Sequence, residues 1–213
     1  MAVHDITPVL GKEAPDWPGD PAFSRTTVAA LAKGDACDLS LLHMSAHAGA
    51  HLDAPGHFIP GGRTLDSYPA DAFILPALVA AIRHPEEIRV DELNGLETSS
   101  GMALLFQTDN SARGLTTSRT FSPDWVYLSR EAASWCVERR LALVGIDALS
   151  IDRCNDAAHP THLALLGAGI LILEGINLRE VEPGRHTLIC LPLRVAGAEA
   201  SPVRAVLTEY RGD

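Results

Sequence analysis

The chain has 213 residues, of which 46% are hydrophobic and 21% are charged, a balance that excludes a disordered chain and a fibre. Its 27 acidic and 17 basic residues give a net charge of -10, which argues against a surface for nucleic acid or an anionic membrane. No apolar run reaches the roughly 18 residues of a membrane span, and His4, Asp5 and Pro8 exclude a secretory signal peptide. We therefore expect a single cytoplasmic domain over residues 1–213.

The four cysteines agree with a reducing compartment, because they are scattered and form no CxxC pair. Cys136 falls in a stretch with helical spacing and Cys190 in an apolar run, which predicts buried thiols that act as small hydrophobes. The last three residues, 211–213, spell Arg-Gly-Asp. Without a secretion signal, they are interpreted as a frayed tail rather than as an adhesion motif.

The first third of the chain predicts short strands around irregular segments. Residues 3–6 form a first strand, and turn residues mark 16–21 as a loop. Residues 37–44 form an apolar strand with weak alternation. Residues 45–69 are rich in Gly, Pro, His and Asp and predict a long irregular surface segment. Such long loops within a compact domain usually carry function.

The rest of the chain alternates apolar runs with two helices. Helical spacing of apolar residues predicts helices over 129–140 and 159–167, and residues 203–208 predict a last strand. Five further runs have the length of buried strands: 76–82, 102–107, 141–146, 170–173 and 188–193. Strands outnumber helices. The expected fold class is therefore α/β: a single mixed α/β domain, strand-rich, with the functional loop after an early strand.

Histidines cluster on the irregular segment. Nine occur in the chain, and His47, His51 and His57 lie close to Asp53 on this one loop. On a helix His47 and His51 would share a face, and in an extended chain His51 and Asp53 would do so. Either geometry lets imidazoles and a carboxylate converge, a donor set that suits zinc, manganese or iron in a catalytic site. His43 lies inside an apolar strand, where a structural role is favoured.

The run from His47 to His57 resembles the His-x-Gly-Thr-His-x-Asp-x-Pro-x-His signature of the bacterial kynurenine formamidase and cyclase family of metal-dependent hydrolases. Ala50 stands where that family has threonine, which removes a hydroxyl group but no metal ligand. The resemblance extends from about residue 3 to residue 208. Its other matching segments are 17–20, 144–147, 172–175, 191–193 and 201–205.

The resemblance implies a binuclear metal site. His47, His51 and Asp53 would hold one divalent ion, and Asp53, His162 and Glu174 a second, with Glu174 touching both. His162 lies twelve residues before Glu174, as in the family, which favours it over His159 as a ligand. Zinc is the favoured metal and manganese the alternative.

The same resemblance gives roles to residues beside the metals. His57 would be the general acid/base, Trp17 and Phe58 would contact the aromatic substrate, and residues 60–62 could hinge a lid. It also implies a homodimer. Arg113 or Arg119 could meet a substrate carboxylate, although solvated arginines are the favoured interpretation of both.

We expect a metal-dependent amidohydrolase of a small aryl amide, with N-formylkynurenine as the type substrate, giving kynurenine and formate. One alternative is a hydrolase of a cyclic amide or lactone, of the isatin-hydrolase kind. Another is a polyketide cyclase or dehydratase, and a fourth is a non-catalytic metal-binding protein. The presence of His57 argues against the last, because metal binding alone would not need it.

Overall fold

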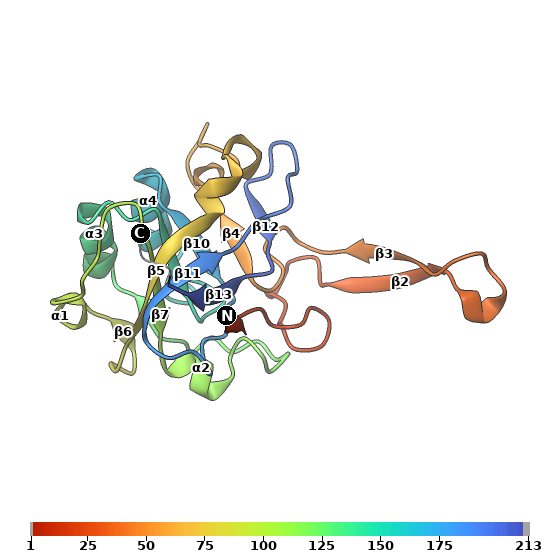
Figure 1. Cartoon of the computed structure of the whole chain (residues 1–213), viewed down its shortest axis with the longest axis horizontal. Helices are drawn as coiled ribbons and strands as arrows, with labels where there is room; N and C mark the ends of the chain where they lie inside the picture. Colours follow the sequence, from red (N-terminus) through yellow and green to blue (C-terminus); the bar gives the residue numbers. More distant parts are fainter. Residues whose placement is uncertain (1, 211–213) are drawn as a thin grey trace.

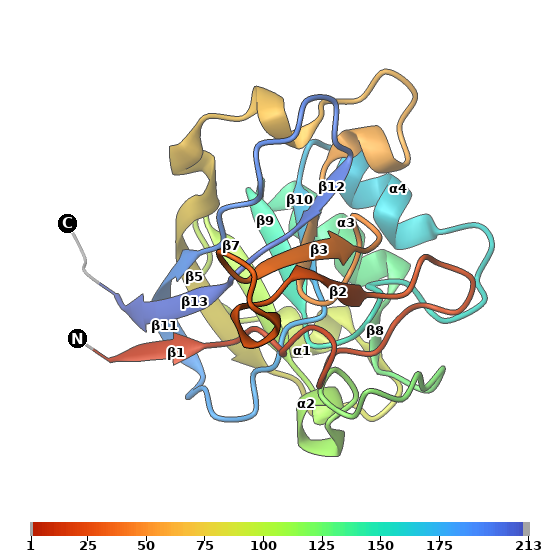
Figure 2. The ribbon, with the colours of Figure 1, turned by 90° about the vertical axis from the view of Figure 1, so that its right-hand side faces the viewer.

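A nine-stranded mixed sheet forms the body of the protein in the computed structural model, which describes residues 2–210 (Figure 1). The Arg-Gly-Asp tail lies outside the described residues. The strand order across the sheet is β1 (Val3–Asp5), β13 (Val206–Glu209), β11 (Gly184–Ile189), β5 (Ile74–Ala81), β7 (Ala103–Gln107), β9 (Leu143–Ile146), β10 (Leu171–Glu174), β4 (His51–Asp53) and β12 (Ala200–Pro202). Strands β5, β7, β9 and β10 are parallel neighbours, and the remaining pairs are antiparallel. Strands β1 and β12 form the opposite edges (Figure 2).

Two helices pack together on one face of this sheet, α3 (Arg130–Glu138) and α4 (Pro160–Gly167). Ser129 caps α3, because its hydroxyl accepts a hydrogen bond from the Ala132 amide at 3.2 Å. Pro160 occupies the first turn of α4, where its missing N–H costs nothing. Both predicted helices are confirmed within two residues of their expected bounds. Two shorter helices are α1 (Val90–Leu93) and α2 (Asp109–Arg113).

Each face of the sheet has its own apolar core, because successive residues of a strand point to opposite sides. Leu104 and Phe106 of β7 pack with α3 and α4, whereas Leu105 belongs to the cluster on the other face. The central strands are buried on both faces, as expected for parallel strands. The mixed, strand-rich α/β class predicted from the sequence is confirmed. No helix within residues 2–210 is long and apolar enough to cross a membrane.

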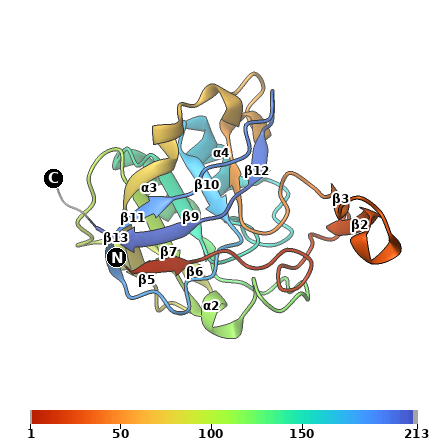
Figure 3. The ribbon, with the colours of Figure 1, turned by 45° about the vertical axis from the view of Figure 1, so that its right-hand side comes forward.

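A two-stranded hairpin projects from this body, as Figures 1 and 3 show. It consists of β2 (Ser24–Ala29) and β3 (Leu39–His43), with the one-turn 3-10 helix η1 (Leu31–Lys33) beyond β2. The strand predicted over 37–44 is therefore present as β3. It is solvent-exposed rather than buried, with Leu41 60% exposed. We call this hairpin, residues 24–43, the arm.

The histidine-bearing segment is more ordered than its composition indicates. It contains β4, all of whose residues are buried, and two 3-10 turns, η2 (Pro55–His57) and η3 (Leu65–Ser67). A third turn, η4 (Ala70–Phe73), leads into β5. Composition indicated an irregular surface segment because Gly and Pro break regular structure, but β10 and β12 pair with β4 on both sides.

Other differences are smaller. The strand predicted over 188–193 begins earlier and ends at Ile189, since Pro192 can only make an isolated bridge with Val203. A two-residue parallel pair, β6 (Glu87–Ile88) with β8 (Tyr127–Leu128), was too short to leave a periodic signal. Cys136 and Cys190 are buried, as predicted.

Candidate active site

Pairing between β4 and β10 brings His51 and Asp53 together with Glu174, which lies more than a hundred residues later in the sequence. The register places Glu174 directly opposite His51, and Ile172 opposite Asp53. Residues two apart in a strand share a face, so His51, Asp53 and Glu174 all point toward the helix-covered side of the sheet. Leu52 points into the core on the other side.

Two glycines allow these segments to approach closely. Gly175 has a left-handed backbone, with φ of 71°, and a Cβ atom there would lie 2.3 Å from the carbonyl oxygen of Gly49. Only glycine fits such a contact. The contact fixes the end of β10 against the segment that leads from His47 to His51.

His162 reaches the same place from α4. The Asp152 carboxylate caps that helix by accepting hydrogen bonds from the amides of Thr161 at 2.8 Å and His162 at 3.2 Å. It also lies 2.6 Å from Nδ1 of His162. This carboxylate–histidine contact orients the ring and leaves Nε2 directed at Glu174, 3.2 Å away.

The His51 ring is oriented in the same way by the backbone. Its Nδ1 lies 2.9 Å from the carbonyl oxygen of Gly49, so Nε2 faces Oδ1 of Asp53 at 3.5 Å and Oε2 of Glu174 at 3.4 Å. Nδ1 of His47 approaches the same Asp53 oxygen at 3.0 Å. Both carboxylates therefore lie between two groups of imidazole nitrogens, with one oxygen toward His51 and the other toward His162.

Asp53 is completely buried, and neither of its carboxylate oxygens accepts a hydrogen bond of acceptable geometry. Burial raises the pKa of a carboxyl group, but the charge on His51 and the contacts from His162 and His47 outweigh burial and hold the Asp53 pKa well below its ordinary value. Burial also raises the pKa of Glu174, but the charge and the hydrogen bond of His162 outweigh burial, so the Glu174 pKa is lowered. Both carboxylates are therefore ionised and require positive charge beside them.

When no metal ion is bound, protonated imidazoles supply that positive charge. Burial lowers the pKa of His51, yet Asp53 and Glu174 raise it to about 9. The pKa of His162 is raised well above its ordinary value, because Glu174 and Asp152 outweigh its burial. A divalent cation would replace these protons. The donor set fits such an ion, because three imidazoles converge on the two Asp53 oxygens that lack hydrogen bonds. The Nδ1 atoms of His51 and His162 each contact a further oxygen, which orients these two rings.

His57 lies beside this cluster on the turn η2. Its ring centroid is 4.2 Å from that of His47 and 6.0 Å from that of His162. Burial and the nearby imidazoles outweigh the attraction of Asp53, so its pKa is lowered and the ring is neutral near pH 7. Within residues 2–210 the ring nitrogens of His57 have no hydrogen-bond partner. One of them belongs to a possible metal-ligand group with His47 and Asp53.

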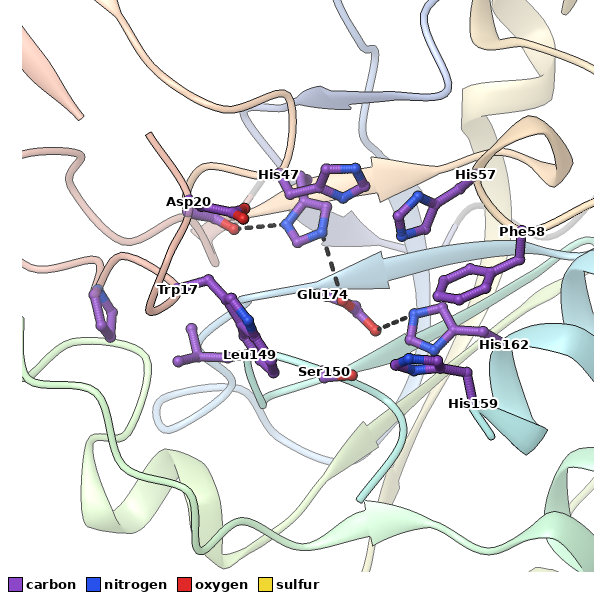
Figure 4. Close-up of a pocket in the computed structure, with 13 residues that line it drawn as sticks. Trp17, Asp20, His47, His57, Phe58, Leu149, Ser150, His159, His162 and Glu174 are labelled. Atoms are coloured by element: carbon purple, nitrogen blue, oxygen red, sulfur yellow. Dashed lines mark hydrogen bonds and ion pairs between the residues drawn. The ribbon is translucent and has the colours of Figure 1, made fainter. Parts of the chain in front are cut away.

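A cavity of about 290 Å³ opens over these groups (Figure 4). Phe58 forms part of its wall and packs 4.7 Å from the ring of His162. Trp17 lies on another wall, supported by Phe121 at 5.4 Å and Trp125 at 5.8 Å between ring centroids. The cavity is lined by Pro15, Trp17, Asp20, His47, Gly49, His51, His57, Phe58, Leu149, Ser150, His159, His162 and Glu174.

The structure brings together all eight residues singled out in the sequence: seven line the cavity and the eighth, Asp53, lies buried directly beneath. Arg113 and Arg119 do not line it, and the Arg119 guanidinium instead donates to the Gly11 carbonyl oxygen. His43 lies on the arm. The sequence did not single out Asp152, because its spacing from the other site residues follows no motif. His159 was considered only as an alternative to His162 as a metal ligand.

A family model described as "Putative cyclase" matches residues 4–153. A "Kynurenine formamidase" of Salinibacter ruber is 34% identical over 98% of this chain and 98% of its own length. Among solved structures, "The Structure Of Potential Metal-Dependent Hydrolase With Cyclase Activity" aligns with a TM-score of 0.85, 29% identity and 99% coverage of both chains. "Isatin hydrolase A (IHA) from Labrenzia aggregata bound to benzyl benzoate" aligns with a TM-score of 0.82 and 26% identity, over 97% of this chain and 93% of that one.

Proposed function

The chain belongs to this cyclase family, and from that premise we propose that it hydrolyses a small aryl amide, with N-formylkynurenine as the type substrate. It is an enzyme of the metal-dependent hydrolase class, as its relatives indicate. The observation that carries the substrate proposal is the position of His57 beside two buried carboxylates in a cavity with aromatic walls, where its ring has no hydrogen-bond partner within residues 2–210.

The proposed ligands divide into two sets. His47, His51 and Asp53 would hold one divalent ion, and Asp53, His162 and Glu174 the other, with zinc favoured and manganese the alternative. The support is the position of Asp53, whose Oδ1 faces His47 and His51 while Oδ2 faces His162. When bound, the ions would supply hydroxide near neutral pH and polarise the amide carbonyl.

The chain's own residues would do the rest. His57 would accept a proton from the attacking water and deliver it to the amide nitrogen as the carbon–nitrogen bond breaks. This delivery matters because an arylamine is a poor leaving group as an anion. Trp17 and Phe58 would hold the aryl ring between them. The products are then the free arylamine and formate.

A second candidate is hydrolysis of a cyclic amide of the isatin kind, favoured by the similarity to the Labrenzia aggregata isatin hydrolase. The polyketide cyclase or dehydratase alternative keeps its support from the cyclase-like relatives, such as "Cyclase-like protein 3" of Oryza sativa, 32% identical over 96% of this chain and 79% of its own length. Both would use the same metal ligands. They differ in the group that leaves.

The deciding experiment assays N-formylkynurenine, isatin and formanilide with the zinc-loaded and the manganese-loaded protein. We expect the formamides to be hydrolysed faster than isatin. The variant His57→Gln should lose most of this activity while keeping its metal. Faster turnover of isatin than of both formamides would favour the second candidate. No turnover of any of the three would contradict both the aryl-amide and the cyclic-amide proposals.

We also propose a homodimer, supported by unpartnered apolar surfaces on the chain. The arm exposes Val28, Leu41 and Leu42 by more than half, and a two-stranded hairpin is at best marginally stable by itself. Ile74 and Leu193 are exposed near a second, apolar cavity of about 250 Å³ at η4 and residues 191–194. Reciprocal seating of each arm on the other copy would bury such surfaces in an isologous interface.

Light scattering tests this proposal. We expect a mass of twice 22.7 kDa, and a monomer for the double variant Leu41→Glu/Leu42→Glu. Thr27→Glu, a charge of the same kind on the neighbouring strand, is the matched control and should remain dimeric. A wild-type mass of 22.7 kDa at micromolar concentration would refute the dimer. The cytoplasmic location expected from the sequence stays a prediction.

A further inference from the structure

His159 has a backbone conformation that is unusual for a residue other than glycine. It lies at the start of α4 with φ of 43° and ψ of 50°, in the left-handed region that residues other than glycine rarely adopt. Its side chain makes no capping hydrogen bond to the helix. Asp152 already accepts from the free amides of Thr161 and His162. Unfavourable backbone conformations that persist without a structural reason are concentrated at functional sites.

The conformation places the imidazole on the wall of the active-site cavity. Its ring centroid is 4.9 Å from that of Phe58 and 6.2 Å from that of His162. Phe58 also packs 4.3 Å from His57. Figure 4 shows His57 and His159 on opposite sides of Phe58. An aryl ring held against Phe58 would therefore have His57 on one side and His159 on the other.

The His159 side chain is free to bind a ligand. Within residues 2–210 its ring nitrogens have no hydrogen-bond partner, although the Asp152 carboxylate lies within 4.8 Å. By contrast, His47, His51 and His162 are directed at the buried carboxylates. The imidazole of His159 is thus the member of the histidine group that remains after metal binding and proton transfer have been assigned.

The cavity lining limits which residues could bind an anionic group of the substrate. The lining contains the carboxylates Asp20 and Glu174 but no lysine and no arginine. Trp17 and Ser150 can donate hydrogen bonds but carry no positive charge. An anionic group on the substrate, away from the metal ligands, would therefore find its N–H donor in a histidine ring.

We propose that His159 is a specificity-determining residue whose ring N–H donates a hydrogen bond to a carboxylate carried by the aryl portion of the substrate. The favoured substrates are then aryl amides that bear a carboxylate, ahead of neutral aryl amides. This inference rests on the proposed function, because it uses the aryl amide placed between Trp17 and Phe58. It gives His159 no part in the chemical step.

The test uses His159→Asn, because Asn155 already adopts a left-handed conformation in this chain and asparagine tolerates it well. His43→Asn on the arm is the matched control. The substrates are N-formylkynurenine and its methyl ester, which lacks the negative charge and carries one additional methyl group. We expect kcat/KM of His159→Asn to fall by about 10- to 100-fold for the acid, mostly through KM, the usual value of a hydrogen bond to a charged group. For the ester, kcat/KM should change by less than threefold.

Metal content and direct binding complete the experiment. His159→Asn should retain the wild-type metal content, whereas a loss of metal, or an equal loss of activity on acid and ester, would overturn the proposal. If the wild type hydrolyses neither substrate, the proposed function is wrong, and benzoate binding then tests the His159 subsite by itself. Titration of the metal-loaded protein, followed by tryptophan fluorescence, should then show at least tenfold weaker benzoate binding in His159→Asn. Equal affinity in both proteins would place benzoate on the metals alone and refute the carboxylate subsite.

Discussion

The two sides of the active-site cavity are built differently. The carboxylate side is carried by paired strands, and its side chains are almost inaccessible, with Asp53 0% and Glu174 3% exposed. The aromatic side is carried by turns and loops, where Trp17 is 38% exposed. Residues on paired strands are held by backbone hydrogen bonds on both sides, whereas loop residues depend on packing. The two buried carboxylates are thus held by the sheet, whereas the aromatic residues proposed to contact the substrate lie on turns and loops.

The largest effect is expected from breaking the carboxylate side at its centre. Asp53→Ala should remove both ions, because the Asp53 oxygens face both sets of imidazole nitrogens, and activity should fall to background. Elemental analysis of protein purified without chelator measures this. Asp20→Ala removes another carboxylate from the cavity lining and should keep its metal. Full metal content in Asp53→Ala would contradict the binuclear site.

The next effect separates His57 from the ligands beside it. His57→Gln should lower kcat by roughly 10²–10⁴, the usual contribution of a positioned acid/base, without loss of metal. The loss should be smallest for a nitroaryl ester, whose leaving group needs little protonation. His51→Ala should instead reduce activity on all substrates alike. If His57→Gln releases metal as readily as His51→Ala, His57 is a fourth ligand, and the division between the two sides is wrong.

A smaller effect is expected one contact behind the ligands. Asp152→Asn keeps the size of the side chain but weakens the orientation of His162, and such changes lower metal affinity by about 10- to 100-fold. Competition with a chelator measures the affinity, and excess metal should restore activity. Asp124→Asn, an exposed aspartate nearby, is the control. Unchanged affinity in Asp152→Asn would show that α4 alone orients His162.

The smallest effect is expected on the aromatic side. Trp17→Ala removes one aromatic contact, worth about 0.5–1.5 kcal/mol, so KM should rise about 2- to 10-fold with metal content unchanged. Trp17→Phe should recover part of this loss. Steady-state kinetics on N-formylkynurenine measures both variants. A large fall in kcat with constant KM would place Trp17 among the groups that act on the transition state rather than on the substrate ring.

The sequence predicted the composition of the site better than its construction. The spacing of His47, His51 and Asp53 identified the cluster, and family resemblance added His162 and Glu174. Spacing alone left helix and extended chain open for this segment, because a three-residue strand is too short for a periodic signal. Burial of β4 follows from pairing with β10 and β12, which are distant in sequence and leave no local trace. The same limit hid Asp152.

For the arm, the sequence predicted a strand correctly but did not predict its exposure to solvent. Its apolar strand β3 was recognised, but an apolar run predicts burial only when a partner covers it. Nothing within residues 2–210 covers the arm in this way, and its leucines are exposed. Sequence patterns therefore identify which residues avoid water, but they do not say whether their partner belongs to the same chain.

The strand register at Asp53 and Ile172 also has a consequence for the order of events during folding. The chain must close a loop of more than a hundred residues before β4 can add to β10, and such long closures come late. Before that event, His47 and His51 offer a metal only a weak, incomplete set of ligands. The ion would then stabilise contacts that are absent from the transition state. Stopped-flow measurements should find that added zinc slows unfolding and leaves the rate of folding nearly unchanged.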